Sequence, residues 1–398
     1  MLTEGSLFSG IGGWTLACEK FGIKSLWASE IEKFPIEVMM EHFPQVKQLG
    51  DVRELKGNEI EPVDIITAGS PCQDFSVANG KRQGLQGERS GLFCKAIKII
   101  NEMREATKGK QPRFFIFENV PGVLNCNGGM DYQEMLEEIT KSKIPMPDSG
   151  RWAGAGMVRG KGIECAWRIL DAQYWGVAQR RRRLFLIADF RGKLSAKILF
   201  KPESLSRDIE KGENSRQEVA AGIATCIRKS DGKIAKKLDK KIYGISAYNS
   251  NAMLSKNAKS GIYEAKTTRT IDLNGGNPAC NQGGMVILEK SHLASGKKTT
   301  GCLMANCGTK QWLGNQEAFS GDYHIIREKN IRRLTPLECE RLQGLPEQWT
   351  LINTKKCTDS ARYKAIGNGM AQPCPDFIIN SLIREMKIEK LKENEKNV

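Results

Sequence analysis

Short apolar runs alternate with longer amphipathic segments through the first half of the chain. We predict strands for the short runs, at residues 5–8, 26–29, 65–68, 114–117, 167–170 and 184–188. The amphipathic segments predict helices at residues 14–21, 35–43, 92–107 and 132–142. Gly22 is placed to close the first helix and Pro35 to begin the second. Because strands and helices alternate, we predict an α/β fold with a parallel sheet covered by helices.

The pattern changes after residue 200. Residues 201–330 are rich in Lys, Asn, Gly, Ser and Thr and hold few long apolar runs. This composition predicts either a loop-rich second domain or a partly disordered segment, and the sequence leaves both open. Thr335-Pro336 is typical of a helix start, and a last helix is predicted from residue 375 to about 387, with a charged tail behind it. A chain of 398 residues is long enough for two domains.

Charge and cysteine usage narrow the class of protein. The chain carries 61 Lys and Arg against 46 Asp and Glu, a net charge of +15. This excess favours nucleic acid as a partner, although only slightly over a basic surface without one. The 12 cysteines and three histidines are scattered without metal-ligand spacing, so we predict reduced thiols and no metal site. With no apolar run of about 18 residues and no secretory signal, we expect a soluble protein of the cytoplasm.

A glycine-rich loop follows the first predicted strand. Residues 7–13 have the sequence Leu-Phe-Ser-Gly-Ile-Gly-Gly, in which glycines let the backbone turn sharply and approach a ligand closely. Glu30 lies about 20 residues on, at the end of the second strand, where it could hold ribose hydroxyls. Asp51 follows the next segment and could accept a hydrogen bond from an adenine amino group. Such loops also occur as ordinary turns, so this feature alone does not establish a cofactor site.

Three further features carry candidate chemistry. Cys72 follows the strand at 65–68 in a polar, glycine-rich loop, which favours a reactive thiol over a buried structural cysteine. Glu118 emerges from four apolar residues and therefore needs a partner, either in a plain salt bridge or at a site beside Cys72. Four arginines, 180–183, precede the last strand; alternation would put Arg181 and Arg183 on one side of the chain and the other two opposite.

Together these features resemble the DNA (cytosine-5)-methyltransferase family of bacteria and phages. The glycine loop, Pro71-Cys72-Gln73, Glu118-Asn119-Val120 and Gln179-x-Arg181-x-Arg183 are similar to its motifs and occur in its order. Residues 333–344 and Ile366-Gly367-Asn368 are similar to its last two motifs. The sequence departs from the family pattern at Ala178, at Gly369-Met370 and in a longer segment at 144–163, none of which removes a group that the chemistry needs.

The resemblance implies a fold, a reaction and a set of site residues. It implies a Rossmann-like sheet with helices on both faces that binds S-adenosylmethionine, and methyl transfer to carbon 5 of a cytosine flipped out of double-stranded DNA. The catalytic residues it implies are Cys72 as nucleophile, Glu118 at ring nitrogen 3, Arg183 at the cytosine carbonyl and Arg181 as support. The cofactor residues it implies are Phe8, Gly10, Gly12, Glu30, Ile31, Asp51, Val52 and Asn368.

The resemblance also implies a domain organisation. We expect a catalytic domain at 1–195, a target-recognition domain at 196–359, a segment at 360–390 that returns to the catalytic domain, and a frayed tail at 391–398. We expect a monomer in a bacterial or phage-infected cell; whether a cognate restriction enzyme accompanies it stays open. Two alternatives keep the fold: a cytosine-5 RNA methyltransferase and a catalytically silent DNA-binding protein. A nicotinamide-dependent oxidoreductase would leave the Cys72 and arginine motifs unexplained.

Overall fold

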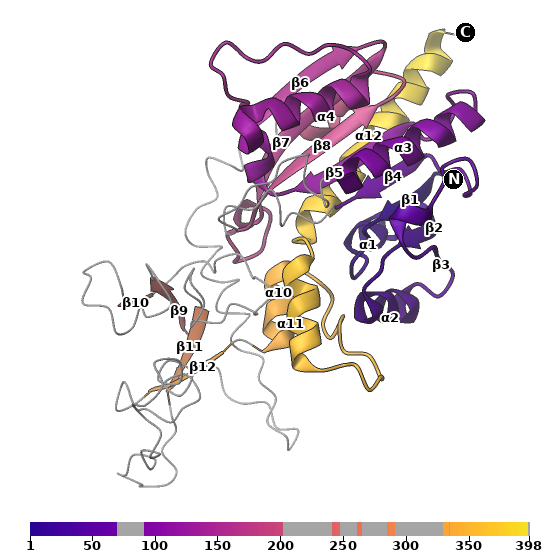
Figure 1. The fold of residues 1–398 in the computed structure, drawn as a ribbon. Helices are drawn as coiled ribbons and strands as arrows, with labels where there is room; N and C mark the ends of the chain where they lie inside the picture. The colour runs from indigo at the N-terminus through magenta and orange to yellow at the C-terminus, as the bar shows by residue number, and fades with distance from the viewer. Residues whose placement is uncertain are drawn as a thin grey trace, which may run out of the picture. The chain divides into compact units, whose positions relative to one another are not determined.

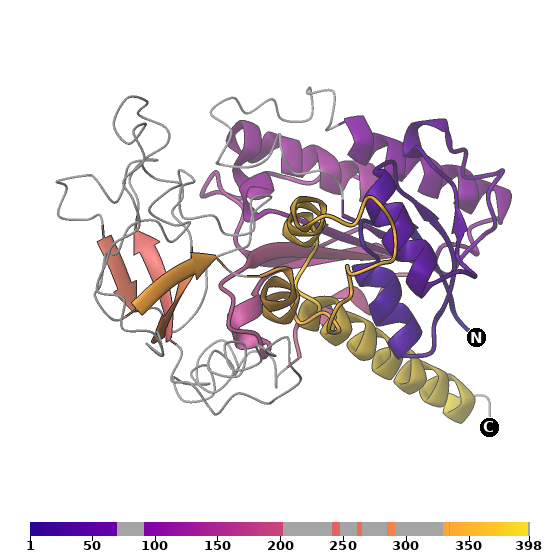
Figure 2. The same ribbon diagram turned by 90° about the horizontal axis from the view of Figure 1, so that it is seen from below.

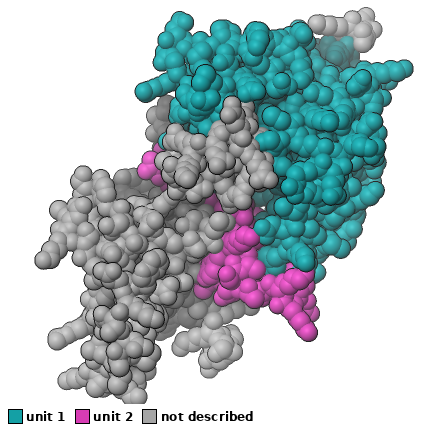
Figure 3. Space-filling view, in the orientation of Figure 1, with its two compact units in different colours: residues 1–171, 182–209, 372–398 teal, residues 172–181, 210–371 magenta. Residues whose placement is uncertain are grey.

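The computed structural model describes residues 1–69, 91–201 and 335–396, together with the backbone of four strands between them. The chain divides into two compact units (Figure 3). Unit 1 comprises Met1–Asp171, Arg182–Ile209 and Gln372–Val398, and unit 2 comprises Ala172–Arg181 and Glu210–Ala371. Among the helices of the described residues, none is both long and apolar enough to cross a membrane.

Unit 1 is built on an eight-stranded sheet in the order β3-β2-β1-β4-β5-β8-β7-β6 (Figure 1). Its strands are β1 Thr3–Leu7, β2 Lys24–Ser29, β3 Lys47–Gln48, β4 Ile65–Ala68, β5 Phe114–Asn119, β6 Ala155–Gly160, β7 Ile163–Asp171 and β8 Arg182–Asp189. Strands β4 and β5 are almost continuously apolar, as expected of parallel strands with both faces covered, whereas β1 also buries the polar Glu4 and Ser6. Phe93, Phe115 and Phe117, for example, pack together with ring centroids 5.2 to 6.5 Å apart.

The sheet is parallel in only one half. Strands β1 to β5 pair in parallel, as predicted, but β8, β7 and β6 are added antiparallel. The predicted parallel pairing therefore holds for this half of the sheet and not for the other. The reason is local for β6 and β7: only Lys161 and Gly162 join them, at φ 46° and 79°, and a two-residue turn of this kind connects antiparallel strands. The sequence pattern missed β6 because its side chains alternate between exposed and half-buried positions.

All four predicted helices of the first half are present with slightly shifted ends: α1 Gly13–Lys20, α2 Lys33–His42, α3 Gly91–Ala106 and α4 Met130–Thr140. Gly22 closes α1 with φ 77°, as predicted, and its N–H donates to the carbonyl of Glu19. Pro35 is not the first residue of α2, which begins at Lys33. A proline is accepted there because N–H groups of the first helical turn need no partner inside the helix.

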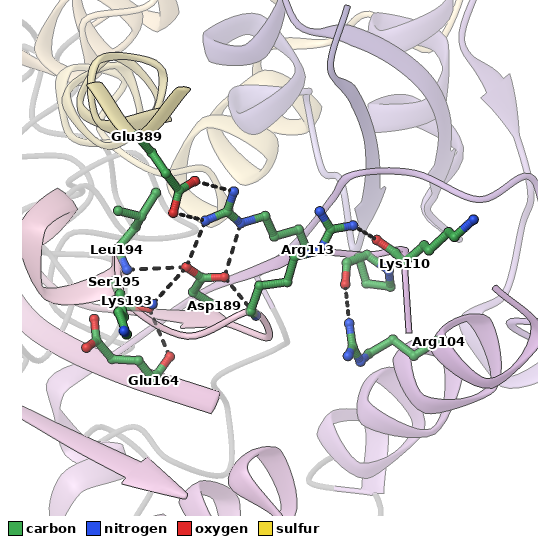
Figure 4. Close-up of polar contacts among 11 residues, drawn as sticks. Arg104, Lys110, Arg113, Glu164, Asp189, Lys193, Leu194, Ser195 and Glu389 are labelled. Carbon is green, nitrogen blue, oxygen red and sulfur yellow. Dashed lines mark hydrogen bonds and ion pairs between the residues drawn. The ribbon is translucent and has the colours of Figure 1, made fainter. Parts of the chain in front are cut away.

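The last helix, α12, runs from Pro373 to Lys396 and therefore passes the predicted end at 387 and enters the expected frayed tail. It lies beside α1 and the short helix α5, Ser195–Leu199 (Figure 2). Near its end, Glu389 accepts two hydrogen bonds from the Arg113 guanidinium, at 2.6 and 3.0 Å (Figure 4). The segment is rich in Lys, Glu and Leu, which favour a helix, and the ion pair with Arg113 adds an anchor near its end.

The described part of unit 2 contains a four-stranded antiparallel sheet and the α-helices α10 and α11. The sheet has the order β10-β9-β11-β12, with β9 Lys241–Ser246, β10 Gly261–Glu264, β11 Met285–Lys290 and β12 Lys329–Arg333. Helix α10, Pro336–Gln343, begins as predicted: the Thr335 hydroxyl accepts from the Glu338 N–H, and the Glu338 carboxylate accepts from the Thr335 N–H. Helix α11, Asp359–Asn368, packs against α10.

Candidate active site

The predicted site residues of unit 1 gather at one edge of its sheet. In the register of the parallel strands, the last residues of β2, β1 and β4 lie in one row with Phe117 of β5. The residues that come next, Glu30, Phe8, Gly69 and Glu118, therefore leave four neighbouring strands at the same level. Because neighbouring strands are about 4.8 Å apart, Phe8 and Glu118 are separated by roughly 10 Å along this edge. Open α/β sheets bind their ligands at such an edge.

The glycine loop has an unusual backbone. Phe8, Gly10 and Gly12 all adopt positive φ, at 56°, 54° and 85°. A side chain at Gly12 would collide with Met39, whose sulfur lies 2.3 Å from the position of a Cβ atom, so glycine is required there. The corresponding position at Gly10 has no atom within 4 Å among the described residues. Gly10 therefore leaves space beside the backbone that a ligand could occupy.

Glu30 holds this loop in place. One carboxylate oxygen accepts from the Gly10 N–H at 2.8 Å, and the other accepts from the N–H groups of Ile31 and Glu32 at 2.8 and 2.9 Å. Each carboxylate oxygen has two lone pairs, so Glu30 can still accept from a hydroxyl group. Its neighbour Ile31 is a large apolar residue with 63% of its surface exposed, at the level where the resemblance implies a cofactor contact.

Val52 is the first residue of a short 3-10 helix, η1, Val52–Glu54, and Asp51 is its N-cap. Asp51 accepts from the Arg53 N–H at 2.9 Å, and the Arg53 guanidinium pairs with its carboxylate. Hydrogen bonds from this guanidinium and N–H hold the pKa of Asp51 below its ordinary value, so it is ionised and accepts hydrogen bonds at neutral pH. Val52 is buried in the hydrophobic core. The sequence reading of this segment missed Arg53, for which the i, i+2 charge pair is the only signal.

The beginning of α1 is suited to a ligand with a carboxylate. Its N-cap, Gly12, has no side chain to accept from the free N–H groups of the first turn. The hydroxyl of Ser9, in the loop, is buried and has no hydrogen-bond partner among the described residues. Buried polar groups are normally satisfied, so this hydroxyl fits a polar molecule beside the loop. The residues present therefore fit the amino-acid end of S-adenosylmethionine.

Glu118 has the partner that its position demands. Its carboxylate pairs with the Nε of Arg183 at 3.0 Å, and both side chains are nearly buried, at 13% and 15% exposed. They come from the neighbouring strands β5 and β8. Arg180 and Arg182 are exposed, whereas Arg181 is buried and Arg183 half-buried, so the predicted alternation of the arginines is confirmed.

Unit 2 holds two other predicted residues. The Nη2 of Arg181 donates to the carbonyls of Gly367, at 3.1 Å, and of Gly369, so it fixes the backbone on both sides of Asn368. Asn368 is the last residue of α11 and is exposed. Cationic groups are favourable at the C-terminal end of a helix, which accounts for the position of Arg181.

Cys72 lies outside the described residues. The chain leaves the end of β4 through Gly69, between the glycine loop on one side and Glu118 on the other. Cys72 is three residues beyond Gly69, and three residues span at most about 10 Å. The position of its thiol stays a prediction. Among the described residues, no three His, Cys, Asp or Glu side chains gather as a metal site would require.

Solved structures of methyltransferases have a similar fold. The Dnmt2 methyltransferase of S. pombe superposes with a TM-score of 0.57 at 16% identity, over 97% of this chain and 99% of that one. A putative DNA modification methyltransferase encoded within an E. coli prophage superposes with a TM-score of 0.53 at 17% identity, over 97% and 100%. The sequence model of the C-5 cytosine-specific DNA methylases matches residues 2–144 and 155–384. The chain belongs to this family, which confirms the resemblance found in its motifs.

Curated relatives are similar over most of the chain. The DNA N-6-adenine-methyltransferase of Escherichia phage P1 is 30% identical over 95% of this chain and 60% of its own length. The type II methyltransferases M.DsaV of Dactylococcopsis salina and M2.BsuMI of Bacillus subtilis are 24% and 25% identical, over 96% and 92% of this chain and 84% and 71% of their own lengths. The chain thus spans about 60% of the phage P1 relative.

Proposed function

We propose that this chain transfers a methyl group from S-adenosylmethionine to carbon 5 of a cytosine in double-stranded DNA, through a covalent adduct of Cys72 with a flipped-out base. One observation carries the proposal. The cofactor loop, the end of β4 that leads to Cys72, and the Glu118–Arg183 pair occupy adjacent strands at one level of one sheet edge. The chain that leaves β4 can place the Cys72 thiol between a base held by Glu118 on one side and a methyl donor on the other.

The donor would be held by the loop and the residues beside it. Bound S-adenosylmethionine supplies an electrophilic methyl group. Gly10 leaves the backbone open to it, and Glu30 can accept from its ribose while it holds the loop. Ile31 offers an exposed apolar surface to the adenine, and ionised Asp51 can accept from the adenine amino group. By the same family resemblance, Asn368 contacts the amino-acid end.

The base would be activated by addition of the Cys72 thiolate. The sulfur forms a bond to carbon 6 of the cytosine, and the ring electrons move to make carbon 5 nucleophilic. Glu118 shares a proton with ring nitrogen 3, and Arg183 donates to the carbonyl oxygen, so negative charge on the ring is stabilised. That oxygen is bonded to carbon 2, the ring neighbour of nitrogen 3, so a carboxylate and a guanidinium 3.0 Å apart can contact both groups together. After methylation, a base takes the proton from carbon 5, the double bond between carbons 5 and 6 forms again, and the bond from carbon 6 to sulfur breaks, which releases Cys72 as a thiolate.

Recognition of DNA would come from the remainder of the chain. A base must leave the duplex to reach this edge, which costs a few kcal/mol of unstacking. The net charge of +15 favours contacts with phosphates. We assign recognition of the target sequence to the target-recognition domain at 196–359, with the 360–390 segment returning the chain to the catalytic domain, in a protein that acts as a monomer.

The experiment that tests the proposal is methyl transfer from labelled S-adenosylmethionine to mixed-sequence duplex DNA. Mass spectrometry of the nucleosides identifies the product, and base-resolution sequencing locates it. We expect 5-methylcytosine within one short sequence motif. N6-methyladenine as the product, the base named for the phage P1 relative, would refute the assignment to cytosine. Transfer to tRNA alone would favour the RNA methyltransferase, and binding of DNA without any transfer would favour a silent protein.

A further inference from the structure

The side chain of Gln372 links the end of the chain to its beginning. Gln372 directly precedes α12, is 3% exposed, and uses one amide nitrogen for two hydrogen bonds. Its Nε2 donates to the carbonyl of Gly13 at 3.0 Å and to the carboxylate of Asp376 at 2.9 Å. Gly13 is the first residue of α1 and comes directly after the glycine loop. This contact therefore acts where the loop becomes a helix.

A second contact joins the same two helices at the other end of α1. Lys20, the last residue of α1, pairs with the other carboxylate oxygen of Asp376 at 2.5 Å. Asp376 thus links Gln372 and Lys20, so α1 is held at its beginning by Gln372 and at its end by Asp376 of α12. The two ends differ in environment: Lys20 is 55% exposed, whereas Gln372 is buried. Buried hydrogen bonds fix geometry more strongly than exposed ion pairs do.

The other two glycines, Gly10 and Gly12, contact residues that lie within the first 45 positions of the chain. Gly10 is held by Glu30, and Gly12 lies against Met39 of α2. The junction at Gly13 is held from 359 residues away. The free N–H groups of the first turn of α1 take their direction from this junction, because they belong to the same turn of helix.

We infer that Gln372 is a positioning residue for the cofactor: by holding the Gly13 carbonyl, it sets the direction in which the glycine loop and the first turn of α1 present their N–H groups. This inference rests on the proposed function, because it concerns the same cofactor site. Gln372 does not itself contact the donor. Its loss weakens binding of the cofactor and leaves the chemical step intact once the site is saturated.

The test compares Gln372→Leu and Gln372→Glu with Lys20→Met as the matched control, in the full chain. Affinity for S-adenosylhomocysteine is measured by calorimetry, and KM for S-adenosylmethionine and kcat by methyl transfer. We expect Gln372→Leu to lose about tenfold in affinity, the size expected for one buried hydrogen bond with an unpaired carbonyl left behind. KM should rise by a similar factor while kcat stays within about twofold. Lys20→Met should bind like the wild type, since it removes only an exposed pair.

The Gln372→Glu variant separates positioning from simple loss of packing. A carboxylate cannot donate to Gly13 and is repelled by Asp376, whereas its protonated form can donate one hydrogen bond. Its affinity relative to the wild type should therefore recover as the pH falls from 8 to about 5, and that of Gln372→Leu should not. Wild-type affinity in Gln372→Leu, or an equal loss in Lys20→Met, would overturn the inference alone. Failure of the wild-type chain to bind S-adenosylhomocysteine would overturn the proposed function and the inference with it.

Discussion

Replacing Arg113 with methionine should destabilise unit 1 strongly, because a buried carboxylate depends on that arginine. Arg113 is 12% exposed and bridges Asp189, which is fully buried, and Glu389 on α12 (Figure 4). Asp189 also accepts from the backbone N–H groups of Arg191, Lys193 and Leu194. Methionine keeps most of the side-chain volume, so the change tests charge and hydrogen bonding more than packing.

The magnitude follows from what the substitution leaves behind. Removing one partner of a buried ion pair typically costs about 3–5 kcal/mol, because the other charge stays buried. We expect a value near 3 kcal/mol, since three backbone N–H groups continue to solvate Asp189. Glu389→Gln should cost less, about 1 kcal/mol, because Glu389 is 28% exposed and Asp189 keeps its arginine. Lys143→Met, which removes an exposed pair, is the control and should leave the free energy of unfolding unchanged.

The pH dependence gives a second, independent check. Burial acts to raise the pKa of Asp189, but hydrogen bonds and charge from Arg113 outweigh it, so the pKa lies below its ordinary value. In the wild type this carboxylate therefore contributes stability at neutral pH that is lost as the pH falls through its folded pKa. Without Arg113, burial dominates and raises the pKa, so protonation relieves the buried charge. The deficit of Arg113→Met should narrow as the pH falls from 7 towards 4.

Urea unfolding followed by tryptophan fluorescence, at several pH values, measures these differences. A loss below about 1 kcal/mol at pH 7 would show that Arg113 is not needed to compensate Asp189. A deficit that widens on acidification would contradict the proposed cause even if the magnitude at pH 7 were correct.

Three further outcomes follow from single residues. Cys72→Ala should abolish turnover and leave the fold intact by circular dichroism; normal methylation by this variant would sink the covalent mechanism. Gly12→Ala should cost about 1–3 kcal/mol in urea unfolding, because alanine is strained at φ 85° and its methyl group would meet the Met39 sulfur 2.3 Å away, and an unchanged midpoint would contradict this. Burial raises the pKa of Glu4 to about 7, although the Thr67 hydroxyl donates a hydrogen bond to it. The contribution of Glu4 to the free energy of unfolding therefore falls as the pH rises from 4.5 to 7. Glu4→Gln should remove that loss, on the order of 3 kcal/mol, and an identical pH profile would argue against a protonated Glu4.

Local patterns determined much of the architecture. The apolar runs in β4 and β5 are short and nearly uninterrupted, and a parallel strand covered on both faces needs that composition. The helix start at Thr335 was equally predictable, because a capping box involves only residues three positions apart. Glu118 was marked as a residue that needed a partner by the apolar strand before it.

The order of the motifs along the chain determined the family but not the contacts among them. The sequence could not reveal that Arg183 is the partner of Glu118. The two residues lie on β5 and β8, and the antiparallel pairing of these strands depends on the tertiary fold. It missed β6, whose half-exposed residues carry no strong periodic signal. It placed the end of α12 too early, although Lys, Glu and Leu favour a helix there, and it could not show the ion pair with Arg113, 276 residues away.

The sequence by itself therefore determined strands such as β4 and β5 and the glycine loop, since these depend on neighbours within a few residues. Only the tertiary structure decided which groups hold one another: Glu30 with Gly10, and Gln372 with Gly13. The physical reason is that such hydrogen bonds depend on the register of strands and the packing of helices, and these are fixed by the burial of the whole core.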